Sequence, residues 1–329
     1  MRPLGDSSTL SSAQAQARTR ISSAVLLVAA SLLWSGQGVA VKLLTGHLQP
    51  LAIALLPFYA VTTAGLLLLS FRKSDENRWT RAWQHRHELL FVGIGGQLLA
   101  QVGMTLGVSE SLASDGAILS MLIPILSTAL ATWLLREQLT RLRVISLLMG
   151  FAGVLLLSGN LPAHAVAGLD RSHALPLEGN LMIAAGCIGS AFYNVYSKRL
   201  LAQFSELEIL FFSYLATALC GLPLLILFAP HCLSDLSRLR LPSWLALSYL
   251  AFGLYGLSMV LFLRALRWVD AILASASLYL VPLFGVALGI SVLHESLSLQ
   301  TMAGSAVILL SALLLFRYDG TLAPCPSGK

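Results

Sequence analysis

Long apolar segments recur along the whole chain, and short polar connections separate them. Candidate helices lie at 21–45, 49–71, 88–109, 113–135, 142–160, 177–201, 206–229, 242–266, 270–293 and 298–317. At a rise of about 1.5 Å per residue, each segment is long enough to cross a hydrocarbon core about 30 Å thick. The pattern predicts an all-α integral membrane protein with ten transmembrane helices.

Composition supports this prediction. Hydrophobic residues make up 57% of the 329 residues and charged residues only 11%, and the mean hydropathy is +0.79. A soluble domain carries about a quarter charged residues, so this chain has too few charges to cover a surface that faces water. We interpret the polar segment 1–20 as a disordered tail and residues 318–329 as a short C-terminal tail. The four cysteines lack the spacing of a metal site or a disulfide framework.

The basic residues predict an orientation. If the N-terminus is inside, 17 of the 21 Lys and Arg residues fall on the inner side, and only Lys42, Arg171, Arg238 and Arg240 fall outside. Cytoplasmic loops of membrane proteins carry such an excess. We therefore expect both termini in the cytoplasm and a multi-pass protein of the plasma membrane, the inner membrane in a bacterium. The net charge of +6 then reflects these loops and not a nucleic-acid partner.

The two halves of the chain align when one is shifted by 156–158 residues. "SGQGVAVKLL" (35–44) matches "AFYNVYSKRL" (191–200), which pairs Lys42 with Lys198. "IPILSTALATWLLREQL" (123–139) matches "VPLFGVALGISVLHESL" (281–297), which pairs Pro124 with Pro282 and Glu137 with Glu295. The predicted repeats, 21–160 and 177–317, each hold five helices. Since five is odd, the second repeat is inverted, an arrangement typical of transporters with substrate held near the midplane.

Three stretches carry a family resemblance: "LLWSGQGVAVKLL", "LASDGAILSMLIPILSTALATWLLREQLTRLRVISLLMGFAGVLLL" and "DAILASASLYLVPLFGVALGISVLHESLSLQTMAGSAVILLSALLLF". They resemble the drug/metabolite transporter superfamily in its ten-helix EamA-like branch, over roughly residues 21–317. The resemblance implies a secondary transporter built from two five-helix repeats. Four-helix cation exporters of that superfamily carry a glutamate in helix 1. This chain has none there, so their proton-coupled scheme is not transferred.

The middle of the predicted membrane spans is polar but uncharged. Candidate cavity residues are Trp34, Gln37, Gln97, Gln101, Ser120, Tyr193, Asn194, Tyr255, Ser275 and Tyr279. Gln97 and Gln101 are four residues apart and share one helix face. Amides and hydroxyls can bind a carboxylate and an ammonium group, and aromatic faces can pack a side chain or attract a cation. The alternative is that these side chains only bond across helices as packing residues.

These features favour a transporter that exports small metabolites such as amino acids by alternating access, with no cofactor and no enzymatic activity. Because ion relays usually need ionisable groups within the membrane, facilitated diffusion or exchange is expected. A carrier of nucleotide-sugars or phosphorylated metabolites would need basic residues in the cavity. A membrane enzyme would need a nucleophile or metal ligands at depth, and a sensor subunit a soluble output domain. Substrate identity, flux direction and oligomeric state, a homodimer included, stay open.

The repeat markers at helix ends suggest structural roles. Glu137 and Glu295 are expected to accept hydrogen bonds from the first amides of the helix that follows each of them, or to pair with a cation such as Arg141. Lys42 and Lys198 are expected to extend toward lipid headgroups. Glycines within the spans are expected to let helices approach closely; they are Gly93, Gly95, Gly96, Gly150 and Gly153.

Overall fold

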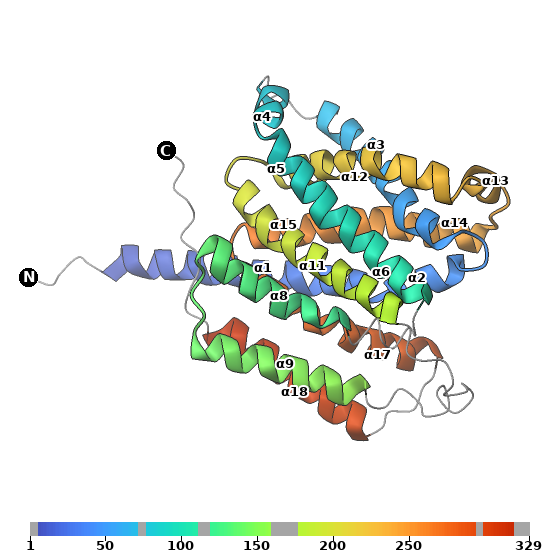
Figure 1. Cartoon of the computed structure of the whole chain (residues 1–329). Helices are drawn as coiled ribbons and strands as arrows, with labels where there is room; N and C mark the ends of the chain where they lie inside the picture. The colour runs from blue at the N-terminus through green and yellow to red at the C-terminus, as the bar shows by residue number, and fades with distance from the viewer. Residues whose placement is uncertain (1–5, 72–76, 111–118, 159–176, 294–298, 319–329) are drawn as a thin grey trace, which may run out of the picture.

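The computed structural model of the chain describes residues 6–71, 77–110, 119–158, 177–293 and 299–318. Apart from an isolated bridge between Thr45 and Leu48, the regular elements of these residues are helices (Figure 1). Those of the first half are α1 (Asp6–Ser35), α2 (Gln37–Leu44), α3 (Pro50–Phe71), α4 (Arg78–Gln84), α5 (Arg86–Phe91), η1 (Val92–Leu98), α6 (Leu99–Glu110), α8 (Leu122–Leu130), η2 (Ala131–Leu135) and α9 (Arg141–Ser158).

The second half repeats this pattern of long and interrupted helices. Its elements are α11 (Leu177–Leu200), α12 (Glu206–Phe228), α13 (Cys232–Ser237), α14 (Leu241–Ser248), η3 (Tyr249–Ser258), α15 (Met259–Leu266), α16 (Ala271–Ala276), η4 (Ser277–Tyr279), α17 (Leu280–Leu293) and α18 (Leu299–Tyr318). The segments 1–5, 72–76, 111–118, 159–176, 294–298 and 319–329 lie outside the described residues.

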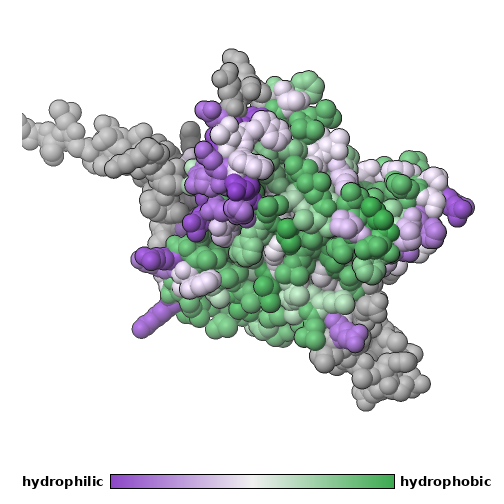
Figure 2. Space-filling view, turned by 45° about the horizontal axis from the view of Figure 1, so that its top comes forward, coloured by the Kyte–Doolittle hydropathy of each residue, from purple (hydrophilic) through white to green (hydrophobic). Residues whose placement is uncertain are grey.

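Several helices have the length and hydropathy of membrane spans. Among the described residues, five meet both conditions: Ile21–Val41, Pro50–Phe71, Arg86–Gly107, Glu206–Phe228 and Leu241–Leu266. Shorter apolar stretches cover Leu122–Leu135, Ala271–Gly285 and Met302–Phe316. Figure 2 shows hydrophobic residues across the middle of the face in view and hydrophilic residues toward its edges. An apolar surface of this extent suits lipid and not water, so the chain is a multi-pass membrane protein.

Helix α1 begins at Asp6, within the segment that the sequence assigns to a disordered tail. The stretch 13–20, "AQAQARTR", is rich in alanine, glutamine and arginine. These residues have high intrinsic helix propensity, and they continue directly into the apolar part of the same helix. The polar composition of this segment therefore does not prevent helix formation.

Helix irregularities recur in both halves. The π-helices η1 and η3 begin at Val92 and Tyr249, an offset within the range that aligns the two half-sequences. A turn at Met121 precedes Pro124, and the 3₁₀ turn η4 precedes Pro282. Proline has no N–H for the carbonyl four residues earlier, which loosens the preceding turn. Both proline interruptions thus follow from the same local chemistry.

Glycines allow two pairs of helices to pack with their backbones nearly in contact. A Cβ atom at Gly103 of α6 would lie 2.7 Å from the Met182 carbonyl oxygen and 2.8 Å from the Gly186 amide nitrogen of α11. Helices α9 and α18, side by side in Figure 1, approach similarly, because a Cβ atom at Gly153 would lie 3.0 Å from the Gly304 carbonyl oxygen. Short interhelical distances of this kind let dispersion forces and backbone contacts hold membrane helices together.

Close approach to a neighbouring helix occurs at four of the five glycines that the sequence analysis named. Added Cβ atoms at Gly93, Gly96 and Gly150 would come within 2.4 Å of Ser213, 3.0 Å of Tyr193 and 2.5 Å of Tyr279. Together with Gly153, these three positions confirm that small residues permit close helix approach. Gly95 is the exception, because its nearest neighbour is the Phe91 ring of its own turn, at 3.8 Å.

Candidate functional site

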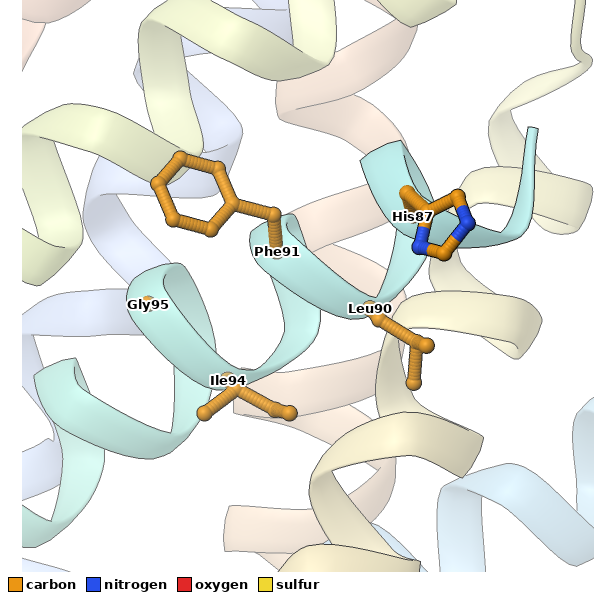
Figure 3. A pocket seen from close by; sticks show the side chains of 5 residues that line it. All are labelled: His87, Leu90, Phe91, Ile94 and Gly95. Carbon is orange, nitrogen blue, oxygen red and sulfur yellow. The ribbon is translucent and has the colours of Figure 1, made fainter.

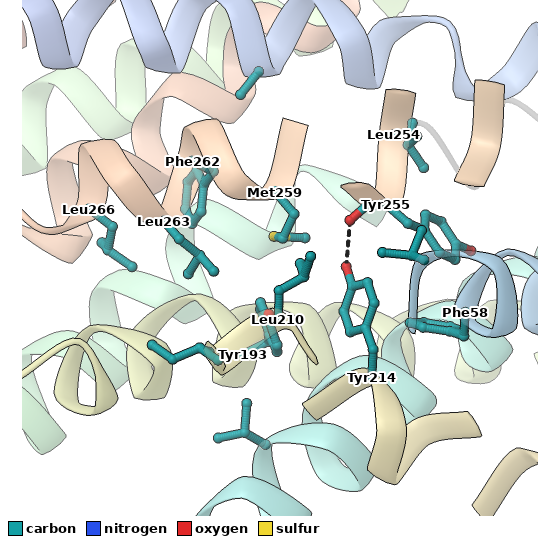
Figure 4. Packing of buried hydrophobic residues seen from close by; sticks show 14 of the residues in the cluster. Phe58, Tyr193, Leu210, Tyr214, Leu254, Tyr255, Met259, Phe262, Leu263 and Leu266 are labelled. Carbon is teal, nitrogen blue, oxygen red and sulfur yellow. Dashed lines mark hydrogen bonds between the residues drawn. The ribbon is translucent and has the colours of Figure 1, made fainter. Parts of the chain in front are cut away.

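Helix α12 holds the π-helices η1 and η3 through side-chain hydrogen bonds. The Tyr214 hydroxyl donates to the Tyr255 carbonyl oxygen of η3 at 3.0 Å (Figure 4). One turn later, the Thr217 hydroxyl donates to the Gly93 carbonyl oxygen of η1 at 2.8 Å. A π-helical turn disturbs the regular i→i−4 ladder and often lies at a functional site. The π-helices η1 and η3 therefore both contact one face of α12.

The Tyr255 side chain connects helices from the two halves. Its hydroxyl reaches the Gln101 Oε1 atom of α6 at 2.9 Å and the Ala54 carbonyl oxygen of α3 at 3.3 Å. Tyr255 is 4% exposed, so this phenol cannot exchange these partners for bulk water. Gln101 is only partly buried, which leaves its amide at the edge of the packed core. The hydrogen bond thus joins the buried Tyr255 to the partly buried Gln101.

Aromatic rings surround this hydrogen bond. Phe58 of α3 lies 4.8 Å from the ring centroid of Tyr214, nearly edge-on, and 4.8 Å from that of Tyr255. Phe58 and Tyr214 are almost completely buried (Figure 4). Edge-to-face pairs of this kind add stabilisation beyond the burial of their area. The rings thus fix the position of the Tyr255 hydroxyl.

A second amide–tyrosine pair lies beside the first. Gln97 of η1 is 3% exposed and Tyr193 of α11 is 1% exposed, and the absent side chain of Gly96 lets Tyr193 pack directly on η1. Gln97, Ser197 and Ser213 surround the Tyr193 hydroxyl, yet that oxygen has no hydrogen bond of acceptable geometry. The structure therefore brings four predicted residues together, and we call Gln97, Gln101, Tyr193 and Tyr255 the amide–tyrosine cluster.

Trp34 and Gln37 lie at a break in the first helix. Helix α1 ends at Ser35 and α2 begins at Gln37, while the Tyr249 hydroxyl of η3 donates to the Leu33 carbonyl oxygen just before the break. The Trp34 ring packs 5.3 Å from Phe262 of α15. Discontinuous helices commonly border substrate sites in transporters. Trp34 and Gln37 are both partly exposed, as residues beside a cavity would be.

The remaining predicted residues lie elsewhere in the bundle. Tyr279 packs on α9, where a Cβ atom at Gly150 would be 2.5 Å from its ring, so packing explains this tyrosine. Ser275 is fully buried on α16 and Asn194 is buried on α11. Ser120 is partly buried just before α8. None of the hydrogen bonds described above joins these four residues to the amide–tyrosine cluster.

Glu137 acts differently from the sequence-based expectation. Its carboxylate accepts hydrogen bonds from the Ala271 and Ile272 amides at 2.7 and 3.0 Å, which are the first amides of α16 and belong to the other half of the chain. The expectation that it caps the following helix, α9, is therefore wrong. A helix N-terminus favours a carboxylate wherever the carboxylate comes from, and the tertiary fold places α16 within reach.

Lys198 also departs from its expected position. Its Nζ atom lies 3.4 Å from Glu137 Oε1 and 3.6 Å from Asp270 Oδ1, and its side chain is 16% exposed. Asp270 pairs in addition with Arg143. Lys198 is thus held by carboxylates and does not extend toward lipid, and it takes the place that Arg141 was expected to take beside Glu137. The Lys42 side chain and Glu295 lie outside the described residues, so their roles stay predictions.

Sequence reasoning missed Phe58, Tyr214, Arg143 and Asp270. Phe58 and Tyr214 occupy matching positions of the two halves, in "FYAVTTAG" (58–65) and "YLATALCG" (214–221), but neither was predicted as a site residue. The ion pair of Arg143 with Asp270 joins residues 127 positions apart. A contact between residues so far apart cannot be predicted from a local sequence pattern.

A depression of about 290 Å³ is lined by His87, Leu90, Phe91, Ile94 and Gly95, whose side chains Figure 3 shows. Phe91 and Leu90 are 59% and 41% exposed, so this depression lies on the outer face of α5 and η1, away from the amide–tyrosine cluster. Within the described ranges, no three His, Cys, Asp or Glu side chains come together in a way that could hold a metal ion. The amide–tyrosine cluster is the better candidate site.

Sequence comparison finds similar proteins that are named as transporters. An uncharacterized transporter of Archaeoglobus fulgidus is 24% identical over 297 residues, which covers 89% of this chain and 98% of that protein. The uncharacterized inner membrane transporter YicL of Salmonella typhimurium is 24% identical over 295 residues, 87% of this chain and 92% of that protein.

A solved crystal structure superposes with a TM-score of 0.72 at 22% identity, over 91% of this chain and 99% of the other. At that identity the likeness shows a common fold. The model of the EamA-like transporter family matches the chain twice, at residues 21–159 and 177–317. Because these matches cover most of the sequence, the chain belongs to the EamA-like transporter family.

Proposed function

We propose that this membrane transporter exports a small uncharged or zwitterionic metabolite, such as an amino acid, by alternating access. The observation that carries the proposal is the amide–tyrosine cluster, which lies where helices of the two halves meet and contains only neutral groups. A site of convergent amides and hydroxyls beside aromatic rings is typical of small-molecule binding. Gln101 and Gln37 would bind the polar ends of the substrate, and Trp34 and the rings around Tyr255 would border its side chain.

The proposed architecture is ten membrane spans arranged as two inverted five-helix repeats, 21–160 and 177–317. The recurrence of π-helices and of proline interruptions at matching positions supports it. In such a protein the two halves adopt unequal conformations, and exchanging them opens one side while it closes the other. The substrate then binds between the halves, where Tyr255 already links α3, α6 and η3.

We further propose that both termini lie in the cytoplasm and that the protein is in the plasma membrane, the inner membrane in a bacterium. The excess of Lys and Arg on one side supports this orientation. The ion pairs in the described part of the chain lie at helix ends and not at the amide–tyrosine cluster. A phosphorylated substrate would leave its charges unpaired in this cluster, which favours a neutral or zwitterionic substrate.

Counterflow in proteoliposomes tests the substrate class. Protein reconstituted into liposomes that are preloaded with an unlabelled amino-acid mixture is expected to accumulate labelled amino acids transiently, without ATP. Liposomes preloaded with nucleotide-sugars should accumulate no labelled nucleotide-sugar above the protein-free control. Transport of the nucleotide-sugar alone would overturn the proposal.

Replacing Tyr255 with phenylalanine is expected to weaken substrate binding. The change removes the hydroxyl that holds Gln101, and a partner left without its hydrogen bond costs about 1–2 kcal/mol, or roughly five- to thirtyfold in Kd. Isothermal titration with the amino acid that gives the strongest counterflow measures this shift. Tyr59→Phe is the matched control, since Tyr59 also donates to a backbone carbonyl, that of Ala218 at 3.0 Å, outside the cluster. Equal losses in both variants would argue against a binding role for Tyr255.

A further inference from the structure

Four buried serines have hydroxyls without a hydrogen-bond partner in the described part of the chain. One is Ser146 of α9. The other three, Ser127 of α8, Ser197 of α11 and Ser275 of α16, lie on helices that contact one another, and each has an exposure of 0%. Other buried helical serines bond back to their own helix, as Ser213 does to the Leu210 carbonyl and Ser277 to the Ala274 carbonyl. A buried hydroxyl that forgoes this local bond is costly. Three such hydroxyls on adjoining helices suggest a surface that is hydrated in another conformation.

These hydroxyls lie between the amide–tyrosine cluster and the ion pairs at the cytoplasmic ends of the helices. On α11, Tyr193 belongs to the amide–tyrosine cluster. Ser197 lies one turn later, beside the Tyr193 hydroxyl, and Lys198 of the ion pairs is the next residue. Ser275 lies one turn into α16, whose first amides Glu137 caps. Helices α8, α11 and α16 contact one another. The serines therefore occupy the packed region that leads from the cluster to the cytoplasm.

The ion pairs close this region with residues from both halves. Glu137 and Arg143 come from the first half, Lys198 and Asp270 from the second, and the four charges cancel. Their side chains are 7%, 1%, 16% and 10% exposed, respectively. We call these four residues the cytoplasmic ion cluster.

The position of Glu137 depends on an uncommon backbone conformation. Arg136 has a φ of 54°, a left-handed conformation that non-glycine residues rarely adopt. It ends η2 and turns the chain so that the Glu137 side chain reaches α16. Asp270, the residue before α16, does not cap that helix with its own side chain, because its carboxylate faces Arg143 and Lys198. The N-terminus of α16 is therefore capped from across the boundary between the halves.

The ion pairs of the cytoplasmic ion cluster are suited to a contact between the halves that must break and re-form during transport. Buried ion pairs gain little net stability because water solvates the separated ions well, so the halves can part once water enters. On the basis of the proposed transport function, we infer that Tyr193, Ser127, Ser197 and Ser275 line the cytoplasmic half of the translocation route. The cytoplasmic ion cluster closes that route in the present conformation. The unpaired hydroxyls then bind water or the passing substrate when the cluster separates.

Thiol labelling from the cytoplasmic side tests this inference without any substrate. The parent is the full chain with Cys187, Cys220, Cys232 and Cys325 replaced by serine and with Ser197→Cys introduced, in inside-out vesicles. A membrane-impermeant maleimide should label the thiol introduced at position 197 slowly in this parent. Adding Glu137→Ala is expected to increase the labelling rate at least tenfold, and adding the milder Glu137→Gln, which keeps one acceptor oxygen, should give a smaller increase.

Two controls separate gate opening from general loosening. Ser258→Cys replaces a buried serine whose hydroxyl bonds to its own helix, and its labelling should stay slow with Glu137→Ala. Glu206→Gln breaks a more exposed ion pair with Arg267 and should leave the labelling of the Ser197→Cys protein unchanged. If the Glu137→Ala variant does not fold, the labelling rate of the Glu137→Gln variant tests the inference.

The inference is overturned if neither Glu137 variant accelerates labelling, or if Ser258→Cys accelerates as much as Ser197→Cys. Failure of amino-acid counterflow would instead overturn the proposed substrate class. It would leave the labelling result intact, because accessibility of the thiol does not depend on which substrate the protein carries.

Discussion

Leucine at Gly103 is expected to destabilise the folded state strongly. The first atom of any side chain there would meet backbone atoms of α11, the Met182 carbonyl oxygen at 2.7 Å and the Gly186 amide nitrogen at 2.8 Å. Backbone cannot rotate away as a flexible side chain does, so α6 and α11 would have to separate. Overpacking in a close-packed core costs about 1–3 kcal/mol and occasionally more, and a contact with backbone belongs at or above the top of that range.

The measurement is the melting temperature and the monodisperse fraction of the purified protein in detergent. Gly95→Leu is the matched control, because Gly95 borders the lipid-facing depression and has only the Phe91 ring at 3.8 Å nearby. We expect Gly95→Leu to leave both quantities nearly unchanged. Equal stability of the two variants would show that α6 and α11 do not pack as closely as described.

Alanine at Glu208 is the second change with a large expected effect. The Glu208 carboxylate accepts from Arg78 at 2.9 Å and from Arg81 at 3.1 Å, and it also accepts from the Ser205 amide at 2.8 Å in a capping box that begins α12. Arg78 donates as well to the Leu69 carbonyl at 3.0 Å, which ties the end of α3 to this group. The Arg78 and Glu208 side chains are only 10% and 6% exposed. Removing the Glu208 carboxylate therefore leaves the buried Arg78 cation without its ion-pair partner, which costs about 3–5 kcal/mol.

Glu206→Ala provides a control in the same helical turn. Glu206 pairs with Arg267 at 2.9 Å, but these side chains are 20% and 34% exposed, and an exposed pair contributes only about 0–1 kcal/mol. The melting temperature in detergent should therefore fall much further for Glu208→Ala than for Glu206→Ala. A similar decrease for both would mean that solvent already screens the Glu208 site.

The helix positions could be predicted because they follow from local properties. The ends of α3, α11 and α18, at Pro50–Phe71, Leu177–Leu200 and Leu299–Tyr318, lie within two residues of the apolar segments seen in the sequence. Hydrophobic length and charge at helix ends are local, and the bilayer imposes them on each segment separately. The π-helices η1 and η3 were not predictable in this way, since their carbonyl oxygens accept hydrogen bonds from α12 hydroxyls that only the tertiary fold brings near.

Part of the candidate site could also be predicted. The spacing of Gln97 and Gln101 placed two amides near one another, and Tyr193 and Tyr255 of the same cluster were among the predicted cavity residues. Tyr279 shows the limit of this reasoning. Tyr279 is a buried aromatic residue with a hydroxyl, like the site residues, but its ring packs against Gly150. Only the position of α9 beside η4 decides that.

Sequence by itself determined that this chain is a multi-pass membrane protein of two similar halves, and it marked the glutamate at 137 as a feature of both. The free energy of placing apolar residues in lipid depends on each segment alone, which is why the sequence suffices there. Only the tertiary structure decided what Glu137 does. A carboxylate is stabilised by whichever amides and cations lie within about 4 Å, and the fold brings to it the start of α16 and Lys198, more than 60 residues away in the chain.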